Sequence, residues 1–186
     1  MKICIDPGHG GIDPGAVGIN GVLEKNIALD ISLKLTNLLK KYNYEVILTR
    51  DSDILKWERK NVSSDLKARC DIANVNKCDI FVSIHCNSSQ NNNATGIETY
   101  YYKTQDKSKE LAEIIQQNLI KYTKLINRGV KRANYYVLRN TTMPSVLIEL
   151  GFINNEKDVK TLVDTKYQNI YAQAIYNGIK EYFKIK

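Results

Sequence analysis

Two histidines and two glutamates are the residues of this chain best suited to chemistry. The chain contains only two histidines, His9 and His85, and each lies at or just past the end of an apolar run typical of a strand. Glu24 lies where a glycine-rich loop enters a helical pattern, and Glu149 ends the apolar run of residues 145–148. A charged residue in such a setting is costly to bury unless it is paired or binds a metal.

Three ligands drawn from histidine and glutamate, with a fourth position open, are typical of a catalytic zinc site. A further carboxylate beside the metal would act as a general base toward water. The chain has no HExxH or CxxC spacing, so simpler roles stay open. His9 could be a polar turn residue. Glu24 could be an acid in the first turn of a helix, where it interacts favourably with the helix dipole. Glu149 could form a buried ion pair with Arg139 or Arg132.

Alternating strand and helix patterns must position these residues. Runs typical of strands cover residues 2–6, 44–50, 79–86, 96–103, 135–138 and 145–150. Apolar residues at helical spacing cover residues 24–39, 66–74, 106–125, 156–163 and 166–183. We expect Ser63 or Ser64 to cap the second helix and Asn154 or Asn155 to cap the fourth.

This alternation predicts an α/β fold. We expect a three-layer αβα arrangement, with a twisted, mostly parallel (mixed) sheet of about six strands and helices on both of its faces. Ligands bind outside the carboxyl ends of the strands in open sheets of this kind. Both histidines lie at those ends, and Glu24 and Glu149 can reach the same edge, so the fold itself would gather the four residues into one site.

Length and composition limit the class of protein. The chain has 186 residues, of which 43% are hydrophobic and 25% charged, and this fits one globular domain with its own core. The composition excludes a disordered or collagen-like chain, and the longest apolar runs are too short for a membrane span. The cysteines lack disulfide-framework or metal spacing, so we expect buried, reduced thiols at Cys4, Cys70, Cys78 and Cys86.

The net charge of the chain is positive, which bears on the kind of partner it could bind. Lysine and arginine number 27 against 20 aspartate and glutamate residues, which gives a net charge of +7. This favours a solvated basic surface or an anionic polymer as substrate. Nucleic acid is disfavoured, since the positive residues are spread along the chain and no nucleic-acid motif is present. The first residues lack the apolar stretch of a secretory signal, so we expect synthesis in the cytoplasm without a signal peptide.

Beyond these patterns, the chain resembles the zinc-dependent N-acetylmuramoyl-L-alanine amidases, in the branch typified by bacterial cell-wall amidases and phage endolysin catalytic domains. The resemblance covers essentially the whole chain, and its segments follow the family order. They are residues 6–11 (DPGHGG), the helix start at Glu24, and residues 66–74, 83–87 (SIHCN), 96–98 (GIE), 128–131 (RGVK), 136–139 and 143–155 (MPSVLIELGFINN).

The resemblance implies a role for each candidate residue. It assigns His9, Glu24 and His85 as ligands of one Zn²⁺ and Glu149 as the catalytic residue, the same four residues that the patterns indicate. Asn87 and Glu98 are further candidates for contacting substrate or supporting the site. A turn role for Asn87 is an equal alternative.

The implied reaction is hydrolysis of the amide between the lactyl group of N-acetylmuramic acid and L-alanine. Glu149 would take a proton from water and pass it to the departing amine. The expected partner is peptidoglycan, without nucleic acid or a membrane span, and we expect a monomer. Two rival classes stay open, namely a zinc hydrolase of another amide, such as a carboxypeptidase or deacetylase, and a non-catalytic wall-binding module.

The expected organisation is a single catalytic domain over residues 1–186. We expect this domain to be joined to a wall-binding module in a longer chain, because tethering raises the local concentration of substrate. A phage lysin that reaches the wall after membrane permeabilisation fits the missing signal peptide better than a fragment of a secreted autolysin does.

Overall fold

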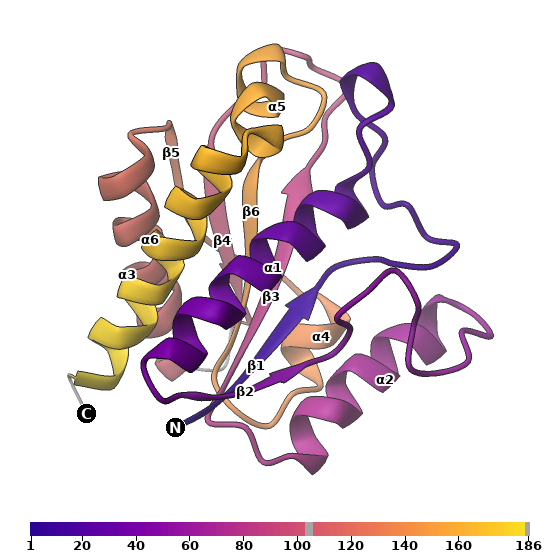
Figure 1. The fold of residues 1–186 in the computed structure, drawn as a ribbon, viewed down its shortest axis with the longest axis vertical. Coiled ribbons are helices and arrows are strands. Elements are labelled where there is room, and N and C mark those ends of the chain that lie inside the picture. The colour runs from indigo at the N-terminus through magenta and orange to yellow at the C-terminus, as the bar shows by residue number, and fades with distance from the viewer. Residues whose placement is uncertain (103–105, 185–186) are drawn as a thin grey trace.

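A six-stranded sheet forms the middle layer of the computed structural model, which describes residues 1–102 and 106–184 (Figure 1). The strand order is β2-β1-β3-β6-β4-β5. All neighbouring strands pair in parallel except β4 and β6, which are antiparallel. The strands are β1 (Lys2–Pro7), β2 (Glu45–Leu48), β3 (Ile80–Asn87), β4 (Ile97–Tyr101), β5 (Asn127–Arg132) and β6 (Ser145–Phe152).

Helices cover both faces of this sheet, as the sequence predicts. One face packs against α1 (Glu24–Lys41), α3 (Asp106–Thr123) and α6 (Thr165–Lys184), with α5 (Glu156–Val163) beside α6. The other face packs against α2 (Val62–Val75) and the short α4 (Tyr136–Arg139). In Figure 1, α1 and α6 lie in front of the sheet. The three-layer α/β prediction is therefore confirmed.

Successive side chains of each strand point to opposite faces of the sheet, so the core has two layers. In β3, Ile80 and Val82 face the layer under α1, α3 and α6, whereas Phe81 faces the layer under α2 and α4. In α1, residues at helical spacing from Ile27 to Leu39 are buried against the first layer. All four cysteines are buried and free, as predicted.

Two helix starts show how capping sets the boundaries. Asn61 caps α2, and Ser64 completes a capping box by accepting from the Asn61 backbone N–H. The expected cap at Ser63 or Ser64 is therefore wrong, because Ser64 occupies the third helical position. Asn155 caps α5 as expected, accepting from two backbone N–H groups.

Two short elements differ from the prediction. Residues 135–138 form no strand; Tyr136–Arg139 is a helical turn, and its Val137 and Leu138 are buried against the sheet. A four-residue apolar run does not distinguish the two states. The sequence patterns do not show β5, because it is a polar edge strand with three basic residues, and such strands lack the apolar alternation of a core strand. Residue 103, expected at the end of the β4 run, lies outside the described residues.

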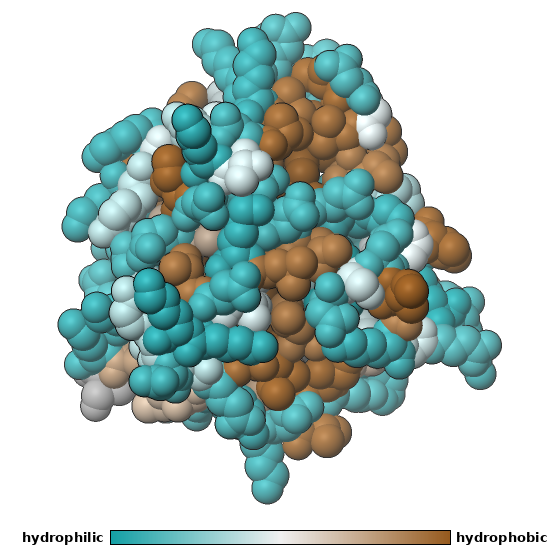
Figure 2. Space-filling view, in the orientation of Figure 1, coloured by the Kyte–Doolittle hydropathy of each residue, from teal (hydrophilic) through white to brown (hydrophobic). Residues whose placement is uncertain are grey.

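Hydrophilic side chains cover most of the face seen in Figure 2, and the hydrophobic side chains lie in separate patches between them. Among the described residues, no helix is long and apolar enough to cross a membrane.

Candidate metal centre

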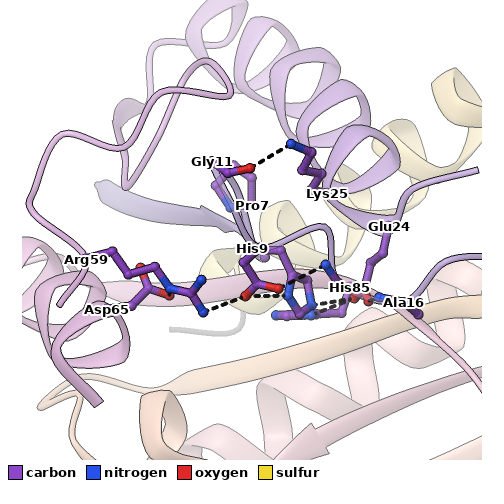
Figure 3. Close-up of polar contacts among 12 residues, drawn as sticks. Pro7, His9, Gly11, Ala16, Glu24, Lys25, Arg59, Asp65 and His85 are labelled. Carbon is purple, nitrogen blue, oxygen red and sulfur yellow. Dashed lines mark hydrogen bonds and ion pairs between the residues drawn. The ribbon is translucent and has the colours of Figure 1, made fainter. Parts of the chain in front are cut away.

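His9, Glu24 and His85 converge at the carboxyl ends of β1 and β3 (Figure 3). One atom from each side chain can be chosen so that all three lie within 4.8 Å of one another. Glu24 Oε1 lies 3.0 Å from His9 Nε2 and 2.9 Å from His85 Nδ1. The strands and the helix start that the sequence indicated thus bring these three candidates together.

The backbone around Glu24 fixes its carboxylate. Oε2 accepts from the backbone N–H of Ala16 at 2.8 Å, and Oε1 accepts from that of Cys86 at 3.1 Å. Burial alone would raise the pKa of Glu24, but hydrogen bonds from His85 and His9 bring this pKa far below its usual value. The carboxylate is therefore held in its ionised form, the form that can bind a metal.

Two glycines allow the side chains of this centre to approach so closely. A Cβ at position 8 would lie 2.3 Å from His85 Cε1. At Gly15, where φ is +67°, a Cβ would lie 2.6 Å from Glu24 Oε2 and 2.7 Å from His9 Cδ2. Any larger residue would push the ligands apart, so the glycine-rich loop is shaped to the site.

The His9 loop is held by a buried arginine from α2. His9 itself has φ +58°, in the left-handed region. Arg69, only 2% exposed, donates to the carbonyl of Pro7 at 2.8 Å and to that of His9 at 2.7 Å. It also donates to Asp6 Oδ1 at 2.8 Å and to Asp65 Oδ2 at 3.3 Å. These contacts keep the backbone at His9 in one conformation.

A second buried arginine holds the same loop from the other side. Arg50 is fully buried and donates to the carbonyls of Pro7 at 3.1 Å and Gly8 at 2.8 Å. Its burial lowers its pKa to about 10, and the charge of Arg69 acts in the same direction. The sequence patterns gave Arg50 no functional role; an arginine that ends an apolar strand run is its only signal.

Asp13 orients His9 from behind. Its Oδ2 lies 3.0 Å from His9 Nδ1 and accepts from Arg59 Nη2 at 3.1 Å, while its Oδ1 accepts from the backbone N–H of Gly15 at 3.0 Å. Histidines that bind metals usually donate their second ring nitrogen to a carboxylate in this way. Sequence reasoning missed Asp13, although an acid four residues after His9 in the same loop is a usable signal.

Glu149 lies beside the centre on β6, directly opposite His85 in the parallel β3–β6 register. Its Oε2 is buried and has no hydrogen-bond partner among residues 1–102 and 106–184. Burial, and then the negative charges of Glu24 and Glu98, raise the pKa of Glu149 well above its usual value. Glu149 therefore has a free acceptor with a strong affinity for a proton.

The ion pair that was the simpler alternative for Glu149 is absent from the described residues. Arg139 Nη1 donates to Asn134 at 2.8 Å, and Arg132 Nε donates to Tyr101 Oη at 3.1 Å. The ion-pair alternative for Glu149 is therefore wrong.

A cavity of about 360 Å³ opens over these residues. His9, Glu24, His85 and Glu149 line it on the sheet side. An apolar wall from α2, α4, the residue before α4 and β6 includes Val62, Leu66, Tyr135, Val137 and Leu147. Its size suits a small ligand or part of a polymer. Asn87 also lines the cavity, but it donates to Glu98 Oε1 at 2.7 Å rather than contacting His85.

These residues fit a zinc ion. Two imidazole nitrogens and one carboxylate oxygen are a donor set that zinc takes in catalytic sites, where a further position stays open to water or substrate. The three donors face one another beside an open cavity, and a separate carboxylate with a free oxygen lies next to them.

The chain is similar in sequence to known proteins. Residues 3–181 match the N-acetylmuramoyl-L-alanine amidase family. The chain is 44% identical over 193 residues to an uncharacterized cell wall amidase of Bacillus anthracis, covering 99% of this chain and 36% of that protein. It is 39% identical over 184 residues to N-acetylmuramoyl-L-alanine amidase LytC of Bacillus subtilis (strain 168), covering 98% of this chain and 35% of LytC.

A solved structure shows the same agreement. The catalytic domain of CwlV, an N-acetylmuramoyl-L-alanine amidase from Bacillus (Paenibacillus) polymyxa var. colistinus, superposes with a TM-score of 0.90 and 41% identity, covering all of this chain and 99% of that domain. The chain thus spans about a third of the length of the Bacillus anthracis and LytC proteins, and nearly all of this catalytic domain.

Proposed function

The chain belongs to the N-acetylmuramoyl-L-alanine amidase family, and we propose that it cleaves the amide between the lactyl group of N-acetylmuramic acid and L-alanine in peptidoglycan. His9, Glu24 and His85 would hold one Zn²⁺. The observation that carries the catalytic part of the proposal is the buried, unpartnered Oε2 of Glu149 beside these three residues.

In this proposal the bound zinc supplies an electrophile for the amide carbonyl and lowers the pKa of water. Glu149 accepts a proton from the attacking water, whose oxygen forms a bond to the lactyl carbonyl carbon. The bond between that carbon and nitrogen then breaks, and Glu149 delivers the proton to the departing nitrogen of L-alanine. The second proton of the water passes from the new carboxyl group to the amine, so the products are a lactyl carboxylate and the ammonium group of L-alanine, and Glu149 returns to its starting state.

The chain's other residues prepare the site for this reaction. Asp13 holds the His9 ring, and Arg69 holds the backbone carbonyl of the same residue. The apolar wall, which includes Leu147 and Val137, excludes water from one side of the cavity. A site whose groups are already in position before substrate arrives has a lower activation free energy, because no reorganisation is needed during the reaction.

Digestion of purified peptidoglycan, with mass analysis of the products, tests the proposal. The expected result is a new free amine on L-alanine and intact lactyl-bearing glycan strands. A new amine inside the peptide would indicate a carboxypeptidase or endopeptidase, and one on the sugar would indicate a deacetylase. A Glu149→Gln protein that binds the wall but releases nothing serves as the matched control.

The substrate lies in the cell wall, outside the cytoplasm. Arrival there by release through a permeabilised membrane, and a tethered wall-binding module in a longer chain, stay predictions.

A further inference from the structure

Behind the wall of the cavity lies a buried carboxylate that is saturated by donors. Glu98 on β4 is only 2% exposed. Its Oε1 accepts from Tyr100 Oη at 2.6 Å and from Asn87 Nδ2 at 2.7 Å. Its Oε2 accepts from Arg128 Nε at 2.7 Å and also from Lys131 Nζ. One carboxylate therefore fixes two cations of β5 and one side chain of the cavity.

The positive charge of this group exceeds its negative charge. Arg128 and Lys131 form ion pairs with Glu98 alone in the part of the chain that the structure describes. Their side chains are 33% and 38% exposed. Arg128 Nη1 also donates to the Thr95 carbonyl at 3.4 Å, which leaves Arg128 Nη2 and the other N–H groups of Lys131 Nζ for a ligand among the described residues. The Arg128 guanidinium also lies 4.8 Å from the Phe152 ring centroid, which restricts its motion further. Two fixed cations with free donors are suited to binding an anion.

The strand register places these cations at a defined distance from the reaction. Glu98 pairs directly with Glu149 across the β4–β6 ladder, and Tyr100 pairs with Lys131 across the β4–β5 ladder. Neighbouring strands lie about 4.8 Å apart, so β5 lies roughly 10 Å from β6. An extended peptide rises about 3.4 Å per residue. A peptide that leaves the scissile amide toward β5 therefore reaches the cations within about three residues.

The opposite side of the cavity has a different character. Asp13 and Asp65 line it there, and their arginine partners Arg59 and Arg69 are bound to them. No excess cation is offered to a ligand on that side by the lining residues. An anionic peptide is thus favoured on the β5 side of Glu149.

We propose that Arg128 and Lys131 bind a carboxylate of the stem peptide, on the second or third residue beyond the scissile amide, and that Glu98 is the residue that positions both cations. This inference rests on the proposed amidase function. It assigns the direction of the peptide across the sheet, from β6 over β4 toward β5. It also gives the enzyme a preference among peptidoglycans whose stem carboxylates are free or amidated.

A matched pair of soluble muramoyl tripeptides tests the inference. The two probes differ only at the second residue, where the carboxylate next to its α-carbon is free in one and amidated in the other. Charge-assisted hydrogen bonds support a preference of about 10–100-fold in kcat/KM for the free carboxylate. Arg128→Gln and Lys131→Gln should each reduce this ratio, chiefly through KM, and the double variant should bring it close to one.

Three further variants separate recognition from general effects of charge and structure. Arg132→Gln removes the same charge from the same strand, but the next residue along a strand faces the other side of the sheet, so the ratio should persist. Lys131→Arg keeps the cation and should also keep the ratio. Glu98→Gln should lower the ratio through KM, because both cations lose their anchor.

Binding of the two probes to Glu149→Gln protein, measured by calorimetry, gives the same comparison without turnover. The inference would be overturned if the wild-type enzyme had equal kcat/KM for the two probes, or if the Glu149→Gln protein bound them with equal affinity. It would also be overturned if the kcat/KM ratio persisted in the folded Arg128→Gln/Lys131→Gln variant. Either result leaves the amidase proposal intact if peptidoglycan is still cleaved at L-alanine. Failure to cleave peptidoglycan at all would instead remove the proposed function.

Discussion

Replacement of Arg69 by methionine tests how the His9 loop is held in place. The guanidinium of Arg69 makes a buried ion pair with Asp6 and donates to the carbonyls of Pro7 and His9. Methionine fills similar space but leaves the Asp6 carboxylate buried with only its hydroxyl donors, Thr49 and Ser83. Breaking a buried pair in this way costs about 3–5 kcal/mol. That is a large part of the roughly 5–15 kcal/mol by which domains are usually stable.

The stability cost of Arg69→Met should depend on pH, because it depends on the charge of Asp6. Burial alone would raise the pKa of Asp6, but the charge of Arg69 and hydrogen bonds from Thr49 and Ser83 bring it below its usual value. A carboxyl whose pKa is lower in the folded state stabilises the fold above its unfolded pKa, near 3.9, and loses that effect as pH falls through the folded pKa. The cost of Arg69→Met should therefore be largest at neutral pH and shrink below about pH 4.

Urea unfolding with a chelator present measures this cost without a contribution from bound metal. Lys67→Met is the matched control, because Lys67 is an exposed lysine of the same helix, and it should barely change the free energy of unfolding. Adding Asp6→Asn to Arg69→Met should recover much of the loss. A cost of Arg69→Met below about 1 kcal/mol at pH 7, or no recovery in the double variant, would refute the role assigned to the pair.

Three other predictions follow, two from the site and one from the net charge. Glu149→Gln should keep zinc and fold while losing about 10²–10⁴-fold in turnover; near-normal lysis by the folded variant would place the base elsewhere. By metal analysis, His85→Ala should lose zinc, and Asp13→Asn should bind it about 10–100-fold more weakly; unchanged zinc content and affinity in both would contradict the assigned centre. Wall association should weaken between low and physiological salt, since charges are screened beyond about 10 Å at 0.1 M; a flat response in a wall pull-down would mean that the net charge of +7 only keeps the surface solvated.

The sequence was sufficient for the α/β fold and for the residues that the structure gathers. His9 and His85 end strands, and parallel neighbouring strands bring their carboxyl ends to one edge of the sheet. Glu24 begins a strongly amphipathic helix whose position on the sheet is then nearly determined. These inferences depend on local patterns, which the chain displays over long segments.

The supporting residues could not be predicted in the same way. Arg69 lies on a helix 63 residues away from its partner Asp6, and nothing local distinguishes it from a solvated arginine. Arg50 binds backbone carbonyls, which leave no mark in the sequence. The polar edge strand β5 was missed for a related reason, since its identity comes from pairing with β4 rather than from its own pattern.

The structure also gives a physical reason for the different roles that the sequence analysis assigned to Glu149 and Glu98. Glu98 and Glu149 pair across neighbouring strands, and both lie near the centre. Burial alone would raise the pKa of Glu98, but donors led by Lys131 and Tyr100 bring this pKa below its usual value and occupy both oxygens. Glu149 has a raised pKa and a free oxygen. A base must accept a proton and return it, so Glu149 suits that role, while Glu98 stays charged and is suited to holding cations.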